Sequence, residues 1–413
     1  MNQTKPQTLK GFRDFLPETM VVRNYVKNIF IEVFENFGFE PLETPALEYA
    51  STLMGKNGAE ADKLVYAFTD QGDRQVGLRY DLTVPVSKVL AIYQNQIPLP
   101  FRRYQIQSVW RAEKPQKGRY REILQCDIDT FGSNSPLVDA EIVAVTYNIL
   151  SRLNFTRFSI RLNSRTVLND ILAQTGITND KNSILQSLDK YQKISQEGVV
   201  KELKSKGLSD SQTSKLFEYI KSAQPDNYLR EVIDLLPSLN IPQDFYLFDP
   251  TMVRGLDYYT GPIFETYVTE PKIGSITGGG RYDNLVKTLG GPDIPAVGTT
   301  IGLDRIVDCI LELNLLPNLA KTTIKVMVAN FGPDTTAASL KLTTSLRSQG
   351  IPTLLYPDPD KLGKQFKYAS DKGIPFVAVI GPDEASANTV TLKNMSTGEQ
   401  KTLKSDAVTA SLI

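Results

Sequence analysis

The segment Arg254-Gly-Leu-Asp-Tyr-Tyr-Thr-Gly261 is the most informative stretch of this 413-residue chain. It places one cation, one carboxylate and two phenols within six residues. The Arg254 guanidinium offers a planar fork for phosphate or carboxylate oxygens, and Tyr258 and Tyr259 offer flat walls and hydroxyls. Gly255 and Gly261 let the backbone approach a ligand closely. Ordinary aromatic packing around a turn would explain a short Arg-Gly-x-Asp string, but the full segment favours a ligand-binding site.

The composition is that of a globular protein, with 41% apolar and 22% charged residues. The chain is too long for a single core, so we expect two or three domains. No apolar run approaches the roughly 20 residues of a membrane span, and the polar first ten residues lack the apolar stretch of a signal peptide. Cys126 and Cys309 lie far apart in apolar settings, which favours free core cysteines and a cytoplasmic location.

Charge and histidine content restrict the possible chemistry. The 46 basic residues balance the 46 acidic residues, so a nucleic-acid binder of this composition must concentrate its cations locally. The chain contains no histidine, which excludes imidazole as a general base, a nucleophile activator or a metal ligand. Catalysis must therefore use carboxylates, cations, backbone dipoles and Mg²⁺ that arrives with a substrate.

Periodicity predicts the domain organisation. Apolar residues at helical spacing indicate a long amphipathic helix between Val22 and Phe37. Residues from about 165 to 240 are more polar with helical spacing, and we interpret them as a mostly helical insertion. Beyond Lys321, strands alternate with helices, which predicts a small α/β domain with a largely parallel sheet. We expect a first domain over residues 1–320, containing the insertion, and a second over residues 321–413.

The segment from Phe101 to Phe131 concentrates positive charge. Between Arg102 and Arg121 the sequence has a single acid, Glu113, and seven cations. The cations are Arg102, Arg103, Arg111, Lys114, Lys117, Arg119 and Arg121. A solvated basic surface is the ordinary interpretation of such a loop. A strand ending at Trp110 and a return strand from Glu122 would instead direct several charges at one point, which suits ATP phosphates or the end of a nucleic acid.

Two further segments gather acidic and polar side chains. In Leu78-Arg-Tyr-Asp-Leu-Thr-Val-Pro85, the ordinary interpretation is a strand end with Thr83 capping the next helix. Alternation along a strand places Gln125, Asp127 and Asp129 on one face. Three polar side chains that face one way beside an apolar run need water or a ligand.

Two remaining segments are weakly specific by themselves. Thr277-Gly-Gly-Gly-Arg-Tyr-Asp283, with Ile301-Gly-Leu-Asp-Arg305, combines a glycine turn with a helix start. A spacing of three places Lys361, Lys364 and Lys367 along one helix flank. A solvated lysine stripe and an RNA contact explain that flank equally well.

Taken together, these segments resemble the motifs of histidyl-tRNA synthetases, and the resemblance extends from Gly11-Phe-Arg-Asp-Phe-Leu-Pro17 to the final domain. Residues 37–47 resemble motif 1 of class II aminoacyl-tRNA synthetases, residues 101–131 motif 2 and residues 277–305 motif 3. The resemblance implies an α+β catalytic domain in which an antiparallel sheet of six or seven strands is flanked by helices. It also implies a helical insertion and a C-terminal α/β anticodon-binding domain.

The resemblance also implies the residues that bind histidine. Asp81 and Thr83 would contact its α-ammonium, and Gln125 would help to hold this polar end. Asp129 would face the imidazole, and a tyrosine hydroxyl would make the second hydrogen bond to it. Tyr259 is the preferred candidate for this tyrosine. The full set expected to bind histidine is Asp81, Thr83, Arg111, Gln125, Asp129, Arg254, Tyr258 and Tyr259.

The catalytic residues are expected to be Arg254 and Arg111, which would flank the α-phosphate and the histidine carboxylate from two sides. ATP, with its Mg²⁺, would be bound by Arg111, Glu113, Arg121 and Arg305, without a metal site made by the protein alone. Contacts with tRNA-His are expected from Lys114, Gln116, Lys361 and Lys364. Motif 1 implies a homodimer, and no membrane partner is expected.

Three positions depart from the family pattern. Asp129 is one methylene shorter than the glutamate of many bacterial relatives, although it keeps the acidic character. Lys114 stands where bacterial relatives commonly have arginine, and it loses the bidentate fork. Asp304 stands where many relatives carry glutamate, and we expect little consequence.

The alternative to an enzyme is a non-catalytic paralogue, such as a histidine-sensing regulatory subunit of ATP phosphoribosyltransferase. Such proteins tend to lose phosphate-binding arginines or the C-terminal domain. This chain keeps Arg111, Arg254, Arg305 and a full final domain, which favours the enzyme.

Overall fold

The computed structural model describes residues 5–54, 62–115, 118–178, 180–254 and 258–412. Contacts divide the chain into two compact units. One consists of Met1–Asp14 and Tyr25–Leu316, and the other of Phe15–Asn24 and Pro317–Ile413. Within the described ranges, no helix is long and apolar enough to cross a membrane.

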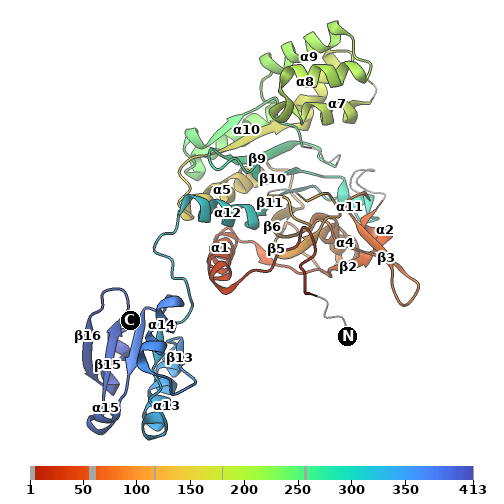
Figure 1. The fold of residues 1–413 in the computed structure, drawn as a ribbon. Helices are drawn as coiled ribbons and strands as arrows, with labels where there is room; N and C mark the ends of the chain where they lie inside the picture. Colours follow the sequence, from red (N-terminus) through yellow and green to blue (C-terminus); the bar gives the residue numbers. More distant parts are fainter. Residues whose placement is uncertain (1–4, 55–61, 116–117, 179, 255–257, 413) are drawn as a thin grey trace. The chain divides into compact units, whose positions relative to one another are not determined.

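The larger unit is built on an eight-stranded sheet in the order β1-β5-β6-β11-β10-β9-β7-β8 (Figure 1). These strands are β1 (Glu40–Pro41), β5 (Phe101–Trp110), β6 (Glu122–Phe131), β7 (Phe158–Ser164), β8 (Tyr246–Phe248), β9 (Pro262–Val268), β10 (Ser275–Arg281) and β11 (Ala296–Gly302). The six central strands pair antiparallel, whereas β1 and β8 pair parallel with their neighbours. The predicted antiparallel sheet is thus extended by a short parallel strand at each edge.

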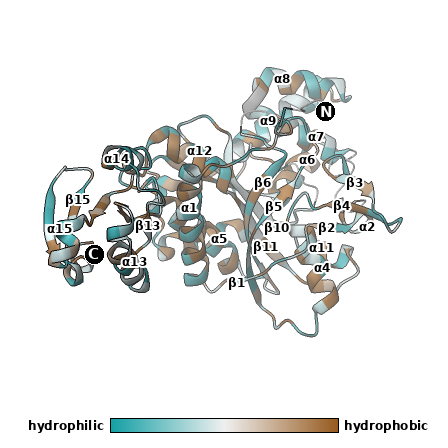
Figure 2. Ribbon diagram, turned by 60° about the horizontal axis from the view of Figure 1, so that its bottom comes forward, coloured by the Kyte–Doolittle hydropathy of each residue, from teal (hydrophilic) through white to brown (hydrophobic). Residues whose placement is uncertain are grey.

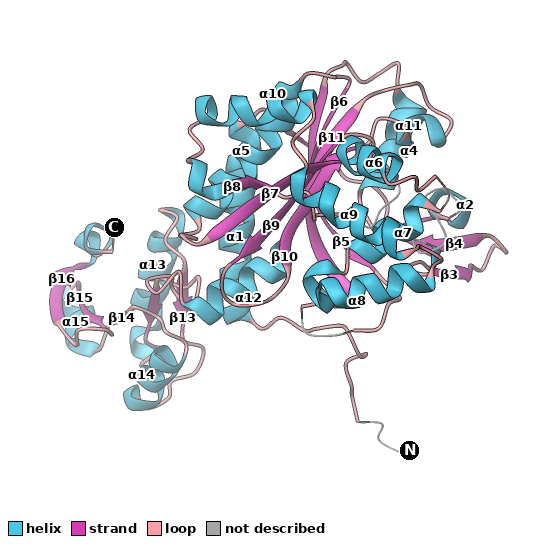
Figure 3. Cartoon of the chain, turned by 90° about the horizontal axis from the view of Figure 1, so that it is seen from above, coloured by secondary structure: helices cyan, strands magenta, loops and turns pink. Residues whose placement is uncertain are grey.

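Helices cover one face of this sheet, as Figure 3 shows for α1 (Pro17–Asn36), α5 (Pro136–Arg152) and α12 (Leu303–Leu313). The Phe34 ring in α1 lies 5.5 Å from the Tyr104 ring in β5, measured between centroids. At the start of α12, Asp304 accepts a hydrogen bond from the backbone N–H of Leu124 at 3.0 Å and from Arg13 at 2.8 Å. Asp304 therefore links the start of α12 to β6 and to Arg13.

The other face of the sheet is bordered by α4 (Thr83–Tyr93) and α11 (Leu285–Thr288). A three-stranded sheet, in the order β2-β4-β3, precedes α4 in the chain. Its strands are β2 (Leu47–Tyr49), β3 (Tyr66–Thr69) and β4 (Gln75–Leu78), and α2 (Ala50–Leu53) follows β2. Figure 2 contrasts the apolar α4 with the largely polar α8 (Tyr191–Ser205) of the insertion. This contrast follows from burial, because the first five residues of α4 are all buried.

Between β7 and β8 the chain forms a helical segment, as the polar helical spacing predicted. Its helices are α6 (Arg165–Gln174), α7 (Lys181–Leu188), α8, α9 (Asp210–Ser222) and α10 (Asn227–Leu235). Apolar residues of this segment, including Leu203 and Leu216, share one buried cluster with Met252, Val253 and Ile263 from the rest of the larger unit. The insertion is therefore packed onto the residues that immediately precede Arg254.

The second unit has a five-stranded sheet in the order β13-β12-β14-β15-β16. Its elements are β12 (Val326–Val328), α13 (Pro333–Ser348), β13 (Thr353–Leu355), α14 (Leu362–Asp371), β14 (Phe376–Val379), α15 (Pro382–Ala387), β15 (Thr389–Asn394) and β16 (Gln400–Lys404). The helix-linked strands β13, β12 and β14 are parallel, as predicted. The strands β14, β15 and β16 pair antiparallel. The sheet is thus less parallel than expected, because β15 and β16 form a hairpin closed by Asn394 and by Gly398 at φ 78°.

A buried ion pair joins α5 to the end of β10. Arg281 lies 2.5 Å from Asp139, which is fully buried and also accepts a hydrogen bond from Tyr228 at 2.9 Å. The Arg281 carbonyl in turn accepts the backbone N–H of Thr260 at 2.8 Å. The pair therefore holds the turn that carries the two neighbouring tyrosines.

Replacing Arg281 with methionine should lower the free energy of unfolding by about 3–5 kcal/mol, because it leaves the Asp139 carboxylate buried without its counter-ion. Calorimetry of the thermal transition of the larger unit would measure the effect. The matched control is Lys287→Met, which removes an ion pair to Asp293 whose side chains are 62% and 65% exposed. The control should change the transition little. Equal shifts of the thermal transition in both variants would contradict a stabilising role of the buried Arg281–Asp139 pair.

Candidate active site

Strand register brings polar side chains to the sheet face opposite α1, α5 and α12. Directly opposed residues on paired strands point to the same face. Asp129 of β6 is opposite Arg103 of β5 on one side and Gly298 of β11 on the other. Two residues along, Asp127 is opposite Gln105 and Thr300. This face of the sheet therefore carries charged side chains on β5 and β6, and Gly298 on the neighbouring strand β11.

Glycines on β10 and β11 form the floor of this face. A β-carbon at Gly298 would overlap the carboxylate of Asp129. A β-carbon at Gly278 of β10 would lie 2.5 Å from the Arg254 guanidinium. Gly298 thus requires glycine, because a β-carbon would also lie 2.5 Å from the backbone carbonyl oxygen of Ile128, whereas at Gly278 the space above the backbone is filled by the end of the Arg254 side chain. The sequence led us to expect a glycine turn at Gly278–Gly280, but these residues lie within strand β10, where the lack of side chains leaves room for large polar groups.

Asp129 is held by two protein partners. The fully buried Arg103 lies 2.5 Å from one carboxylate oxygen, and the Tyr282 hydroxyl donates a hydrogen bond to the other. Burial raises the pKa of Asp129, while Arg103 and Tyr282 act to lower it. Arg103 was counted among the cations expected to converge on phosphates, yet its partner is this carboxylate. Sequence reasoning missed Tyr282 altogether.

Two more carboxylates share this end of the site. Burial raises the pKa of Asp81 to about 6, against the lowering effects of a hydrogen bond from the Val84 N–H and of Arg111. Burial raises the pKa of Asp127 to about 7, with Arg103 lowering it and the neighbouring Asp129 and Asp81 charges raising it further. Three buried carboxylates, those of Asp81, Asp127 and Asp129, thus lie near one fully buried guanidinium, that of Arg103, so acids outnumber buried cations at this end of the site.

Three buried acceptor atoms of these carboxylates and of Gln125 have neither a hydrogen bond nor an ion pair among the described residues. They are Oδ2 of Asp81, Oε1 of Gln125 and Oδ1 of Asp127. The side-chain nitrogen of Gln125 donates a hydrogen bond to the Thr300 hydroxyl at 3.3 Å. The amide oxygen, Oε1, is therefore the atom of Gln125 without a partner. Thr83, the first residue of α4, is buried beside Asp81. Buried acceptors without partners are costly, so these atoms indicate a ligand rich in donors.

Arginines gather at the opposite end. Arg111 donates to the Tyr80 carbonyl at 3.0 Å, and Arg305 donates to the carbonyls of Gly118, at 2.9 Å, and Ser275. Burial lowers the pKa of Arg305, and the charges of Arg119 and Arg111 lower it further. Mutual repulsion of these guanidinium groups would be relieved by an anion.

Arg254 approaches the glycine floor from the side. Its guanidinium donates to Glu265 of β9 at 2.9 Å, and its Nε is buried with no partner among the described residues. The rings of Tyr258 and Tyr259 lie 4.7 Å apart, and Tyr258 lies 5.7 Å from Tyr282. These rings form an aromatic wall beside Arg254. The intervening residues 255–257, including the predicted Gly255, lie outside the described part of the chain.

The remaining predicted residues are spread over both units. Arg121 donates to the carbonyls of Glu113 and Lys10, so in this structure it ties down the loop after β5. Glu113 itself lies 3.4 Å from Arg119. Lys114 is exposed, and Gln116 lies outside the described residues. In the second unit, Lys361 is exposed just before α14, and Lys364 pairs with Asp360 at 2.8 Å.

An antiparallel sheet that carries buried carboxylates and an arginine cluster, in a chain with a separate α/β unit, is the arrangement expected of a class II aminoacyl-tRNA synthetase. Comparison with known families agrees. The family described as "Histidyl-tRNA synthetase" matches residues 11–306, and "Anticodon binding domain" matches residues 325–412. The chain therefore belongs to the histidyl-tRNA synthetase family.

Individual relatives support the family across the full length. The histidine–tRNA ligase of Cytophaga hutchinsonii is 39% identical over 451 residues, covering 99% of this chain and 100% of the relative. That of Helicobacter hepaticus is 40% identical over 422 residues, covering 96% and 95%. The crystal structure of histidyl-tRNA synthetase from a Nostoc species matches with a TM-score of 0.86 at 30% identity, covering 100% of this chain and 99% of that chain.

Replacing Gly298 with alanine should displace Asp129 and reduce histidine-dependent ATP–pyrophosphate exchange by at least about tenfold, the size of losing one charged hydrogen bond. The matched control is Gly363→Ala in α14, where an added methyl group meets nothing within 4 Å. The control should keep its exchange activity. Exchange by the Gly298 variant within twofold of the unchanged protein would show that Asp129 has room to move without consequence.

Proposed function

We propose that the chain is a histidine–tRNA ligase that activates L-histidine with ATP and transfers it to tRNA-His. The observation that carries this proposal is the division of the site into an acidic end with unpaired acceptors and an arginine-rich end. Histidine bound between them would place its ammonium at the carboxylates and its carboxylate towards the arginines. A regulatory paralogue would bind histidine but would need no arginine cluster beside it.

The α-ammonium of histidine fits the acidic end. An ammonium group has three donors, and the free acceptors belong to Asp81, Gln125 and Asp127. Its positive charge would also offset the three carboxylates that share Arg103. Asp127 thus joins the predicted set of Asp81, Thr83 and Gln125.

The imidazole would lie against the aromatic wall. Neutral imidazole has one donor and one acceptor, so Asp129 would accept its hydrogen and a tyrosine hydroxyl, Tyr259 first, would donate to it. Arg103 and Tyr282 fix the Asp129 carboxylate in place for this bond. A side chain without both functions would leave buried polar groups unpaired, which gives discrimination without editing.

The reaction at the arginine-rich end proceeds in two steps. The histidine carboxylate attacks the α-phosphorus of ATP, pyrophosphate leaves, and histidyl-adenylate forms. The terminal ribose hydroxyl of the tRNA then attacks the acyl carbon, and AMP leaves. Arg254 and Arg111 would stabilise the charge that develops at the α-phosphate, and Arg305 would contact the outer phosphates.

Mg²⁺ would enter with the nucleotide. Among the described residues, no group of three or more acidic or cysteine side chains is arranged to hold a metal ion. Mg²⁺ usually takes one or two carboxylates and several phosphate or water oxygens. Bound with ATP, the ion would neutralise the outer phosphates.

We further propose a cytoplasmic homodimer that contacts tRNA through both units. The edge strand β1, together with the exposed Leu47 and Tyr49 of β2, the edge strand of the three-stranded sheet, offers the predicted dimer contact. In the tRNA complex, Lys114 and Gln116 would approach the acceptor end, and Lys361 and Lys364 would approach the anticodon. The domain boundary that we propose lies at residues 320–321.

Replacing Arg254 with alanine should reduce adenylate formation by about 10²–10³, as expected for loss of one donor to the transition state. Histidine-dependent ATP–pyrophosphate exchange measures this step. The control is the exposed Arg157→Ala, which removes a guanidinium outside the site and should leave exchange unchanged. A loss of less than a few-fold at Arg254 would refute its role.

Histidine should bind more tightly as the pH rises from about 5.5 to 8. Below pKa values of about 6 for Asp81 and about 7 for Asp127, these acids are neutral and do not attract an ammonium group; above them both are charged. In Asp127→Asn, the part of the increase near pH 7 should disappear. Calorimetric titration of both proteins isolates Asp127, because the ligand's own imidazole titrates equally in each. Identical pH profiles would remove Asp127 from the binding site.

A further inference from the structure

A chain of polar contacts runs behind Arg254 and away from the reacting groups. Glu265 of β9 accepts from Arg254 at 2.9 Å through one oxygen. Its other oxygen accepts from the hydroxyl of Tyr267, on the same strand, at 2.7 Å. Residues i and i+2 of a strand share a face, so Glu265 and Tyr267 lie side by side. Both oxygens of this carboxylate are thus engaged by the protein itself.

The chain of contacts continues onto β7. Arg161 is directly opposite Glu265 in the β7–β9 pair, and its guanidinium lies over the Tyr267 ring, 4.7 Å from the centroid. The same guanidinium pairs with Asp249 at 2.8 Å. Asp249 also accepts from the backbone N–H of Thr251, at 2.9 Å, and from its hydroxyl, at 2.5 Å. Arg254 is therefore joined by polar contacts to a turn only a few residues before it in the chain.

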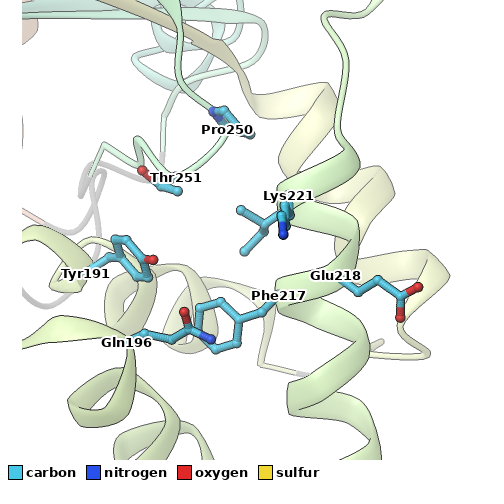
Figure 4. A pocket seen from close by; sticks show the side chains of 8 residues that line it. Tyr191, Gln196, Phe217, Glu218, Lys221, Pro250 and Thr251 are labelled. Carbon is cyan, nitrogen blue, oxygen red and sulfur yellow. The ribbon is translucent and has the colours of Figure 1, made fainter.

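The turn at Asp249–Thr251 is where the helical insertion meets the catalytic unit. Pro250 and Thr251 line a cavity of about 540 Å³ with Tyr191 of α8 and Phe217 and Lys221 of α9 (Figure 4). The next residues, Met252 and Val253, are buried in the same apolar cluster as the insertion helices. The turn is thus fixed on one side by the insertion and on the other by Arg161.

We propose that Glu265, Tyr267 and Arg161 are positioning residues that hold the Arg254 guanidinium over the glycine floor by tying it to the Asp249–Thr251 turn. Arg254 has a long side chain, and Gly278 leaves it room to move. A donor must be fixed before the charge develops if it is to stabilise a transition state without reorganisation. Glu265 sets the direction of one nitrogen of the guanidinium, and the buried Nε, which has no partner among the described residues, remains for the ligand. This inference rests on the proposed role of Arg254.

The decisive variant is Tyr267→Phe, which removes a hydroxyl and leaves the charge of Glu265 in place. We expect the kcat of ATP–pyrophosphate exchange to fall by about fivefold, the size of one hydrogen bond, with the KM for histidine and ATP changed by less than about twofold. Glu265→Gln should reduce kcat more, because it weakens the contact with Arg254 itself. Arg161→Lys keeps the charge but loses the fork and the stacking, so a smaller fall in kcat is expected.

Tyr104→Phe is a matched control. Its hydroxyl also donates to a glutamate, Glu35, at 3.0 Å, but on the sheet face covered by helices. It should keep kcat within about twofold. A general effect of removing a half-buried Tyr–Glu bond would appear in both variants, whereas a positioning effect would appear only at Tyr267.

The closing experiment is a double-mutant cycle in the full-length protein. Because Tyr267 acts through Arg254, Tyr267→Phe should cause no further loss of kcat in an Arg254→Ala background. Additive losses, or a single Tyr267 variant within twofold of the unchanged protein, would overturn the proposal. The experiment distinguishes failure of the proposed function from failure of the positioning role. Absence of exchange in the unchanged protein would remove the proposed function, whereas a large Arg254 effect with a silent Tyr267 would remove only the positioning role.

Discussion

The register of β6 between β5 and β11 is the constraint on which the site depends. A shift of one residue would turn Asp127 and Asp129 towards the helices and carry apolar side chains into the pocket. The register also explains why Gly298 lies where it does. It is the residue opposite Asp129, and only a missing side chain leaves room for that carboxylate. The buried contact between Arg103 and Asp129 reinforces the same alignment from the β5 side.

Much of this arrangement could be predicted from the sequence, because it is encoded locally. Helical spacing indicated the insertion, and alternation placed Gln125 and Asp129 on one face. Arg103 and Tyr282 could not be assigned in this way, since their roles come from pairing between strands that are far apart in the chain. A count of cations in the hairpin gives no information on which of them is buried. Strand alternation together with a hypothesis for the β5–β6 register would have placed Arg103 beside Asp129.

The fold shows the same limit in its second unit. Helix-linked strands predicted parallel pairing, and this is confirmed for β12 with β13 and β14. The β15–β16 hairpin was not predicted, although Asn394 and Gly398 are typical turn residues. Glu265 was missed in the site for a related reason. It lies within an apolar strand, and its importance comes only from the side chains that reach it across the sheet.

The absence of histidine residues has a consequence for recognition, since no imidazole of the protein can compete with a substrate imidazole for Asp129. The crowding of Asp81, Asp127 and Asp129 around Arg103 has another. Without an amino acid, the crowded carboxylates repel one another in the folded chain more than in the unfolded chain, and the ammonium group that we propose to bind there would offset this repulsion. Substrate binding and resistance to unfolding would therefore be coupled. In a cell, the lifetime of such a protein would follow the supply of the amino acid that it consumes.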